Sequence, residues 1–232
     1  MLRFDRFDAL TFDCYGTLID WESGLLAALR PVLRRHGVEC DDERLLALFA
    51  STEQEIEAGP YRLYSEVLGE VMERIGSALG FAPDATERDS LSGSIAIWPP
   101  FPDTLEALGV LKGRFRLAIV SNVDDVLFAG SASLLGVTFD QVITAEQVRS
   151  YKPAPAHFEA ALKRLALPVE RVLHVAQSRF HDIAPAKALG FSTIWVNRRS
   201  GRRGSGATPE GGAVPDLEVA DLATLARLAT GG

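Results

Sequence analysis

Asp13 is the residue of this sequence that is best placed to do chemistry. It ends an apolar run, residues 8–13, that predicts a short buried strand, and Tyr15-Gly16-Thr17 follows closely. The end of a buried strand is a costly place for an acid with a purely structural role. Glycine lets the chain turn there, and the Thr17 hydroxyl can hydrogen-bond to the carboxylate. On spacing alone, a covalent nucleophile and a helix-capping aspartate are equally good interpretations of Asp13.

Further polar residues stand at or after the ends of later apolar runs. Ser121-Asn122 ends one predicted strand, Gln177-Ser178 follows another, and Lys152 and Asp182 lie in segments beyond strands. Ligands bind at the carboxyl ends of the strands in an open parallel sheet, so we expect these side chains to gather with Asp13. An ordinary surface lysine is the competing interpretation of Lys152, and its position after a strand disfavours that interpretation.

The elements that would hold these residues alternate between strand and helix. After residues 8–13, strands are predicted at 115–120, 141–144, 172–176 and 192–196, and helices at 103–111, 125–135, 156–166 and 183–189. Strands that alternate with helices form a parallel sheet with right-handed crossovers. The fold class is therefore predicted to be α/β: a doubly wound parallel sheet core (Rossmann-like) made of residues 1–19 and 97–232.

Residues 20–96 have a different pattern. Apolar residues recur there at helical spacing, as at Leu25, Leu29 and Leu33, and the pattern contains no convincing strand. We expect about four helices, inserted after the first strand as a helical cap. Residues 198–212, rich in Gly and Arg, are predicted to form a surface loop.

Composition narrows the functional classes. The chain has 232 residues, 47% of them hydrophobic, and its net charge of −7 argues against nucleic-acid binding. No apolar run reaches the roughly 18 residues that a membrane-spanning helix needs, and the N-terminus does not have the pattern of a signal peptide. The two cysteines, Cys14 and Cys40, are expected to be reduced thiols of a cytoplasmic protein.

Four short motifs, in this order, resemble those of the haloacid dehalogenase superfamily. They are residues 12–18 (Phe-Asp-Cys-Tyr-Gly-Thr-Leu), Ser121-Asn122, Lys152-Pro153, and Gln177-Ser178 through Asp182. The resemblance covers essentially the whole chain, and it implies a hydrolase that forms an ester on its aspartate. By this resemblance Asp13 is the nucleophile, Thr17 and Lys152 orient it and compensate its charge, and Asp182 positions Lys152 or the hydrolytic water.

Two positions make the chain look like a member of the L-2-haloacid dehalogenase branch. Phosphatases of the superfamily carry a second aspartate two residues after the nucleophile, where this chain has Tyr15, and a Mg²⁺-binding acid where it has Gln177. An amide is a poorer Mg²⁺ ligand than a carboxylate, so we expect neither a metal nor a cofactor. The resemblance then implies that Asp13 displaces a halide from the carbon next to a carboxylate.

The residues that would contact the substrate are assigned mainly by this resemblance. Ser121 and Asn122 are expected to bind the substrate carboxylate. The cap arginine that handles the leaving halide in this branch is absent. Arg62 is the best substitute, although an ordinary exposed arginine is an equally good interpretation. His181 is a weaker candidate for activating water, because its ordinary pKa suits a base near neutral pH. The remaining residues expected at the site are Tyr15, Gln177 and Ser178.

Because the sequence differs from the branch at the cap arginine, more than one substrate is compatible with it. Besides a 2-haloacid, fluoroacetate or azetidine-2-carboxylate would suit the same branch, and a phosphatase is a less favoured alternative. A non-catalytic binding protein is disfavoured because Asp13, Thr17 and Lys152 are all present. The expected partner is a small carboxylate substrate, without nucleic acid or membrane, and a homodimer is an open alternative to a monomer.

Overall fold

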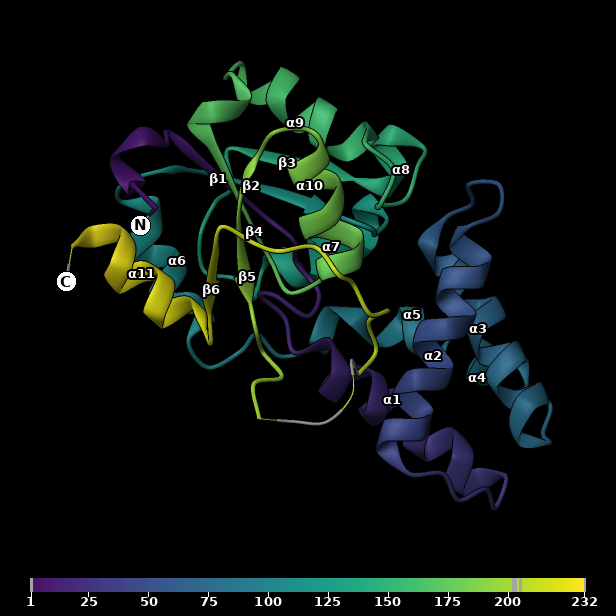
Figure 1. Cartoon of the computed structure of the whole chain (residues 1–232). Helices are drawn as coiled ribbons and strands as arrows, with labels where there is room; N and C mark the ends of the chain where they lie inside the picture. The colour runs from purple at the N-terminus through teal and green to yellow at the C-terminus, as the bar shows by residue number, and fades with distance from the viewer. Residues whose placement is uncertain (1, 202–203, 205, 232) are drawn as a thin grey trace.

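The computed structural model describes residues 2–201, 204 and 206–231. One six-stranded sheet forms its centre, helices cover both faces of the sheet, and a further group of helices lies beside it (Figure 1). The strands run in the order β3-β2-β1-β4-β5-β6, and every neighbouring pair is parallel. Their bounds are β1 (Ala9–Phe12), β2 (Arg116–Ser121), β3 (Gln141–Thr144), β4 (Val172–Ala176), β5 (Ser192–Val196) and β6 (Leu217–Val219).

The helices fall into two groups along the chain. Those of the first group follow β1 and are α1 (Trp21–Arg35), α2 (Asp42–Glu57), α3 (Tyr64–Leu79), α4 (Ala85–Arg88) and α5 (Ser90–Ser94). Those of the second group connect or follow the other strands and are α6 (Thr104–Lys112), α7 (Asp125–Ala132), α8 (Ala145–Val148), α9 (Ala156–Leu165), α10 (Ala184–Ala188) and α11 (Leu222–Thr230). Short turns of tighter or wider helix are η1 (Phe4–Arg6), η2 (Ile95–Ile97), η3 (Val169–Arg171) and η4 (Arg179–Ile183).

Alternate residues of each strand pack on opposite faces of the sheet, as strand geometry requires. On β2, Ala118 and Val120 pack with residues of α9 and α10, whereas Leu117 and Ile119 pack in the larger core that includes α6 and α11. Because both faces are covered, the central strands β1, β2 and β4 are mostly apolar, and nearly all of their residues are buried. The predicted α/β class and parallel sheet are thereby confirmed.

The chain reverses its direction of winding at β1. This strand pairs with β2 on one side and with β4 on the other, so the connections after β1 and β4 lead away from each other. Such a switch point leaves a crevice at the carboxyl ends of the two strands, and ligands of open α/β sheets bind there. Asp13 follows β1 directly and therefore lies at this crevice.

The helices α1 to α5, here called the cap, form the group beside the sheet in Figure 1. Three of them are long and amphipathic, and two are short, where the pattern predicted about four. Trp98, at the end of this segment, packs against Gly24 of α1, where an added Cβ would lie 2.3 Å from the indole ring. The division at residues 19–20 and 96–97 remains a prediction.

Some secondary-structure elements were not predicted from the sequence. The sequence pattern gave no element after Val196, yet β6 and α11 extend the sheet and its helical layer. The helix predicted at 125–135 ends earlier, at Ala132. Arg202, Arg203 and Ser205, which belong to the loop predicted at 198–212, lie outside the described residues. Among the described residues, no helix is long and apolar enough to cross a membrane.

Candidate active site

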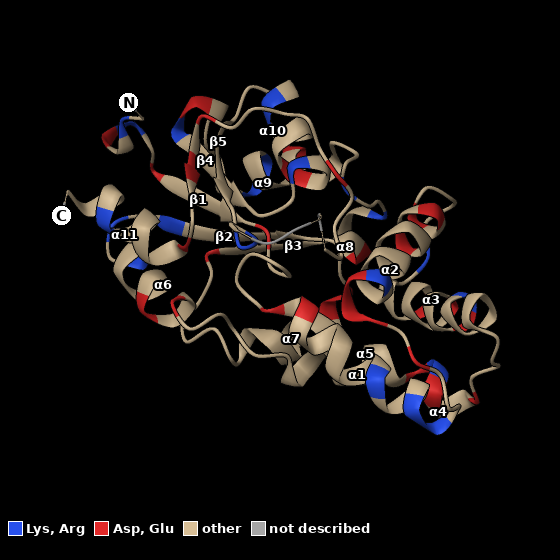
Figure 2. Ribbon diagram, turned by 60° about the horizontal axis from the view of Figure 1, so that its bottom comes forward, with Lys and Arg blue, Asp and Glu red and all other residues tan. Residues whose placement is uncertain are grey.

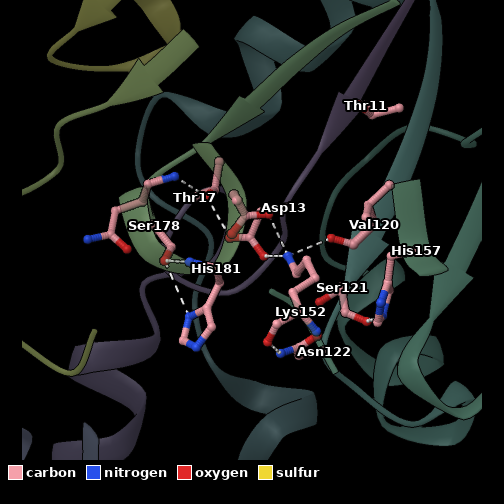
Figure 3. A network of polar contacts seen from close by, with 12 residues as sticks. Thr11, Asp13, Thr17, Val120, Ser121, Asn122, Lys152, His157, Ser178 and His181 are labelled. Carbon is pink, nitrogen blue, oxygen red and sulfur yellow. Dashed lines mark hydrogen bonds and ion pairs between the residues drawn. The ribbon is translucent and has the colours of Figure 1, made fainter. Parts of the chain in front are cut away.

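The carboxyl ends of three neighbouring strands bring the predicted residues together (Figure 3). Asp13 follows β1, Ser121 ends β2, and Gln177 follows β4. Lys152 comes from the segment between α8 and α9, and Asp182 comes from η4. The predicted gathering of these residues at one edge of the sheet is therefore observed.

A buried ammonium group joins two carboxylates at the centre of the site. Lys152 Nζ donates to Asp13 Oδ1 (2.9 Å), to Asp182 Oδ1 (2.7 Å) and to the Val120 carbonyl (2.9 Å), which uses its three hydrogens. The Lys152 side chain is only 2% exposed, so this ammonium is held almost without solvent. The interpretation of Lys152 as a surface lysine is wrong.

The charges at this centre shift one another's ionisation. Burial raises the pKa of Asp13, and Lys152 and the Thr17 hydroxyl limit the rise because both stabilise the carboxylate. The pKa of Asp182 falls to about 2: burial alone would raise it, but Lys152 and His174 outweigh that effect. The two carboxylates raise the pKa of Lys152 against the opposing effect of burial. The lysine therefore stays charged over the whole range in which Asp13 ionises.

Thr17 fixes the orientation of the Asp13 carboxylate. Its hydroxyl donates to Asp13 Oδ2 (2.7 Å) and accepts from the Gln177 backbone N–H (2.9 Å), which ties the turn after β1 to the end of β4. Gly16 has φ +88°, a left-handed conformation that glycine adopts without strain. An added Cβ there would also lie 3.0 Å from Trp21 Nε1. The turn thus requires glycine, as the sequence suggested.

His174 supports Asp182 from inside β4, and it is not among the site residues that the sequence predicted. One tautomer satisfies both of its contacts: Nε2–H donates to Asp182 Oδ1 (3.0 Å), and Nδ1 accepts from the Thr11 hydroxyl (2.9 Å). The only available signal was a histidine within an apolar strand, eight residues before Asp182. The second oxygen, Asp182 Oδ2, is buried and has no hydrogen-bond partner among the described residues.

Ser178 and His181 form the next side of the site. The Ser178 hydroxyl accepts from the His181 backbone N–H (2.9 Å) and lies 3.3 Å from His181 Nδ1. Burial lowers the pKa of His181 to about 4. The imidazole is therefore neutral near neutral pH and a weaker base than that of an exposed histidine, and a role of His181 in activating water stays a prediction.

Asn122 connects the core to the cap. Its Oδ1 accepts from the Lys152 backbone N–H (2.7 Å), and Nδ2 donates to the Lys152 carbonyl (3.1 Å) and to Glu57 Oε2 (3.3 Å). Sequence reasoning missed Glu57, which ends α2, because nothing in a helical pattern tells which acid will face the core. Asn122 is therefore fully hydrogen-bonded before any substrate carboxylate arrives.

Arg62 is not brought to this centre. Its guanidinium forms an ion pair with Glu70 of α3 (2.6 Å), and its side chain is 42% exposed. Only its backbone takes part in the cap–core contact, since the Arg62 carbonyl accepts from the Tyr151 hydroxyl (2.9 Å). The expectation that Arg62 replaces the missing cap arginine is corrected by this geometry: a neighbouring acid on the cap surface holds the guanidinium instead.

A small cavity opens beside Asp13. Tyr15 lies on its wall, with the phenol bonded to the Ser131 hydroxyl (2.9 Å) and the ring edge-on to Trp98 at 6.0 Å between centroids. Gln177 is held through its side-chain oxygen, which accepts from the Thr208 hydroxyl (3.1 Å). The described residues that line the cavity are Asp13, Tyr15, Trp21, Asn122, Lys152, Gln177, Ser178, His181, Asp182 and Thr208.

The donor set does not suit Mg²⁺. The Lys152 ammonium already lies between the two carboxylates that a cation would bridge, and Gln177 offers a neutral amide bonded to Thr208. Mg²⁺ is usually held by carboxylate oxygens and water in an octahedral arrangement. The residues at this site therefore do not fit the metal that phosphatases of the superfamily use.

A parallel α/β sheet with an aspartate and a buried lysine at its carboxyl edge is typical of a class of hydrolases, and comparison with known sequences identifies the family. The sequence model of the haloacid dehalogenase-like hydrolases matches residues 7–190, and the chain belongs to that family of hydrolases. Its relatives include (S)-2-haloacid dehalogenase H-109 of Pseudomonas putida, which is 30% identical over 226 residues, or 93% of this chain and 94% of that protein. The predicted family is confirmed.

Solved structures support the assignment of the chain to this family. The L-2-haloacid dehalogenase PA0810 superposes with a TM-score of 0.80 at 25% identity, over 97% of this chain and 100% of that one. The L-2-haloacid dehalogenase of Xanthobacter autotrophicus with chloropropionic acid covalently bound superposes with a TM-score of 0.80 at 25% identity, over 97% of this chain and 99% of that one. Both belong to the branch that Tyr15 and Gln177 indicate.

Proposed function

We propose that this protein is an (S)-2-haloacid dehalogenase that works without a metal and forms an ester on Asp13. The observation that carries the proposal is the Asp13 carboxylate, held at a strand end by Thr17 and by a buried lysine that supplies positive charge. A carboxylate fixed in this way can attack carbon without first having to be oriented. The named relatives, one with chloropropionic acid covalently bound, support the same chemistry.

The first half-reaction is a displacement at carbon. An Asp13 oxygen forms a bond to C2 of the substrate, and the bond from C2 to the halogen breaks with its electron pair leaving as halide. Halide is a stable anion, so no acid has to protonate it, and a tyrosine can stand where phosphatases of the superfamily have an acid. Ser121 and Asn122, at the end of β2, mark the side of the site on which we propose that the substrate carboxylate is held.

The second half-reaction is ester hydrolysis. Water adds to Cγ of Asp13, the bond from Cγ to the ester oxygen breaks, and a 2-hydroxy acid leaves with an oxygen that began on Asp13. Asp182 Oδ2 is buried and lacks a partner among the described residues, so it is the acceptor we assign to the hydrolytic water. His174 and Lys152 hold that carboxylate in place.

Isotope labelling tests the covalent step. Enzyme in excess over L-2-chloropropionate is allowed a single turnover in H₂¹⁸O, and both enzyme and product are examined by mass spectrometry. The expected result is ¹⁸O at Asp13 and unlabelled lactate, with labelled lactate only in later turnovers. Direct attack of water on C2 would instead label the product at once and would contradict the proposal.

A matched variant tests the nucleophile. Asp13→Asn is nearly isosteric and removes a charge that is costly to bury, so we expect it to fold and to release no halide. Asp8→Asn, which removes an exposed ion pair with Arg171 next to the amino end of β1 and so at the opposite edge of the sheet, is the control that should retain activity. An active Asp13→Asn protein, shown by mass spectrometry not to have deamidated, would overturn the assignment.

A further inference from the structure

The cavity beside Asp13 is short of positive charge. Among the described residues that line it, Lys152 is the one lysine or arginine, and its ammonium is already bonded to Asp13 and Asp182. Two carboxylates and one ammonium leave an excess of negative charge, and a substrate carboxylate would add to it. Repulsion between like charges is strong where solvent is largely excluded. The substrate must therefore be held partly by neutral hydrogen-bond donors.

Glu57 reaches this part of the site from the cap. It is the last residue of α2, a helix with several acidic residues (Figure 2), and its Oε2 accepts from Asn122 Nδ2 at 3.3 Å. The same Asn122 amide is fixed by two hydrogen bonds to the backbone of Lys152. Glu57 therefore lies directly behind Asn122, which lines the cavity, although Glu57 itself is not among the described residues of the cavity wall.

The groups that face Glu57 favour its neutral form. They are Glu53 from α2, Tyr64 from α3, Tyr151 and Lys152 from the core, and Asn122. Burial and the charge of Glu53 raise the pKa of Glu57 well above its ordinary value, against the weaker effects of Lys152 and Asn122. Burial also raises the pKa of Glu53, to about 7.

When one of the two glutamates, Glu53 and Glu57, carries a proton, we expect the proton on Glu57. Glu53 lies one helical turn before it, so the two carboxyl groups share a face of α2 and do not readily ionise together. The Tyr64 hydroxyl donates to Glu53 Oε1 at 2.5 Å, which stabilises the carboxylate of Glu53. Glu57 has only an amide donor at a longer distance, so its carboxylate is stabilised less.

We propose that Glu57 is a specificity-determining residue, which accepts from Asn122 at Oε2 and donates its own O–H to the carboxylate of the bound substrate. The cap then recognises a small monocarboxylic acid with a neutral donor. The inference rests on the proposed function only in taking a carboxylate as the group by which the substrate is held.

Recognition of this kind depends on pH. As the pH rises through the pKa of Glu57, the acid ionises, loses its donor and repels the substrate carboxylate. Affinity therefore falls toward alkaline pH. Glutamine keeps a hydrogen-bond donor at every pH, so Glu57→Gln should bind substrate without this dependence, whereas Glu57→Ala removes the donor altogether.

Steady-state halide release from L-2-chloropropionate tests the proposal between about pH 6 and 9. The wild-type KM should rise at least about tenfold over this range, the KM of Glu57→Gln should stay flat, and that of Glu57→Ala should be about 10- to 100-fold higher at pH 6. Glu55→Gln, on the exposed side of α2, is the control that should behave as wild type. An unchanged or lower KM in Glu57→Ala, or a flat wild-type profile, would overturn the role.

Calorimetry with propionate, which carries no leaving group, separates this inference from the proposed function. Propionate binding in buffers of different ionisation enthalpy should take up close to one proton at alkaline pH in the wild type and in Glu55→Gln, and none in Glu57→Gln. Proton uptake that requires Glu57 would support its role even if no haloacid were hydrolysed. Binding without proton uptake, or no binding of propionate by the wild type, would refute it.

Discussion

At the scale of single residues, Lys152 explains how two acids can lie together at the site. Asp13 and Asp182 are almost fully buried, and each bonds to the same ammonium. A buried ion pair adds little stability over an apolar replacement, but removing one partner leaves an uncompensated charge. The lysine is therefore needed both to keep Asp13 ionised and to keep the fold intact at neutral pH.

Lys152→Ala should lose activity and also lose stability in a pH-dependent way. Without the ammonium, burial and mutual repulsion raise the folded-state pKa values of Asp13 and Asp182 above those of the unfolded chain. The folded variant then takes up protons as pH falls, so its deficit of about 3–5 kcal/mol at pH 7.5 should shrink toward pH 5. Urea unfolding at both pH values measures this.

The matched control is Lys112→Ala. Lys112 forms a partly exposed ion pair with Asp140 at the surface, so its loss should cost no more than about 1 kcal/mol. A Lys152→Ala protein with the same deficit at both pH values would contradict the electrostatic explanation.

Thr17→Val should move the acid side of the rate profile to higher pH. The attacking Asp13 must be ionised, and its pKa already lies above the ordinary 3.8 because of burial. Valine keeps the shape of threonine but removes both the hydrogen bond to the carboxylate and the acceptor of the Gln177 N–H. The pKa of Asp13 therefore rises further, and kcat/KM falls about tenfold at pH 5. The measurement is kcat/KM between about pH 4 and 8. An acid limb at the same pH in both proteins would show that Thr17 does not tune Asp13.

At the scale of elements, the start of α3 is capped by the core. Leu63, at the N-cap position of this helix, makes no side-chain capping bond, and Asp124 from the segment after β2 accepts from the Tyr64 N–H (2.6 Å) and the Ser65 N–H (2.9 Å) instead. Unpaired N–H groups at a helix start favour a nearby carboxylate. Asp124 thus fastens the cap to the segment that carries Asn122.

Asp124→Ala should therefore affect both stability and substrate binding. We expect the loss of a helix cap to lower the free energy of unfolding by about 0.5–2 kcal/mol. We also expect a raised KM, because α2 and α3 would no longer be held over Asn122. The comparison is Asp84→Ala, which removes the cap of α4 within the cap itself and should lower stability without changing KM. Equal KM values in the two variants would argue against a role of Asp124 in positioning.

At the scale of the whole molecule, the sequence predicted most strands of the sheet, because apolar runs recur along the chain between helical segments. The runs that end at Thr144, Ala176 and Val196 are strands with the predicted bounds, because strands covered on both faces are built mostly of apolar residues. The strand β6 was missed since Leu217-Glu218-Val219 is too short for a pattern. A homodimer and a cytoplasmic location stay predictions, and sedimentation can test the first.

A site residue was predictable from the sequence only where a chemically suitable side chain stands in a motif at or after the end of a strand. Asp13, Thr17 and Lys152 belong to motifs, and the structure brings them together. Arg62 and Glu57 lie on or beside cap helices, where the face that meets the core depends on how the cap docks. Local pattern does not contain that information, so one arginine was wrongly placed at the site and one glutamate was overlooked.

Neither the activity nor the stability of this protein should depend on a divalent metal, although phosphatases of the same superfamily depend on Mg²⁺. Among the described residues, no group of three or more acids, histidines and cysteines is arranged to hold a metal ion, and Lys152 already compensates the two acids that are present. We expect dialysis against EDTA to leave halide release unchanged within about twofold, and millimolar Mg²⁺ not to raise the thermal midpoint, because a ligand stabilises a fold only by binding to it. Activity that disappears with EDTA and returns with Mg²⁺ would mean that Gln177 or Asp182 serves a metal after all. A Mg²⁺-dependent midpoint in the wild type would lead to the same conclusion without any assay of turnover.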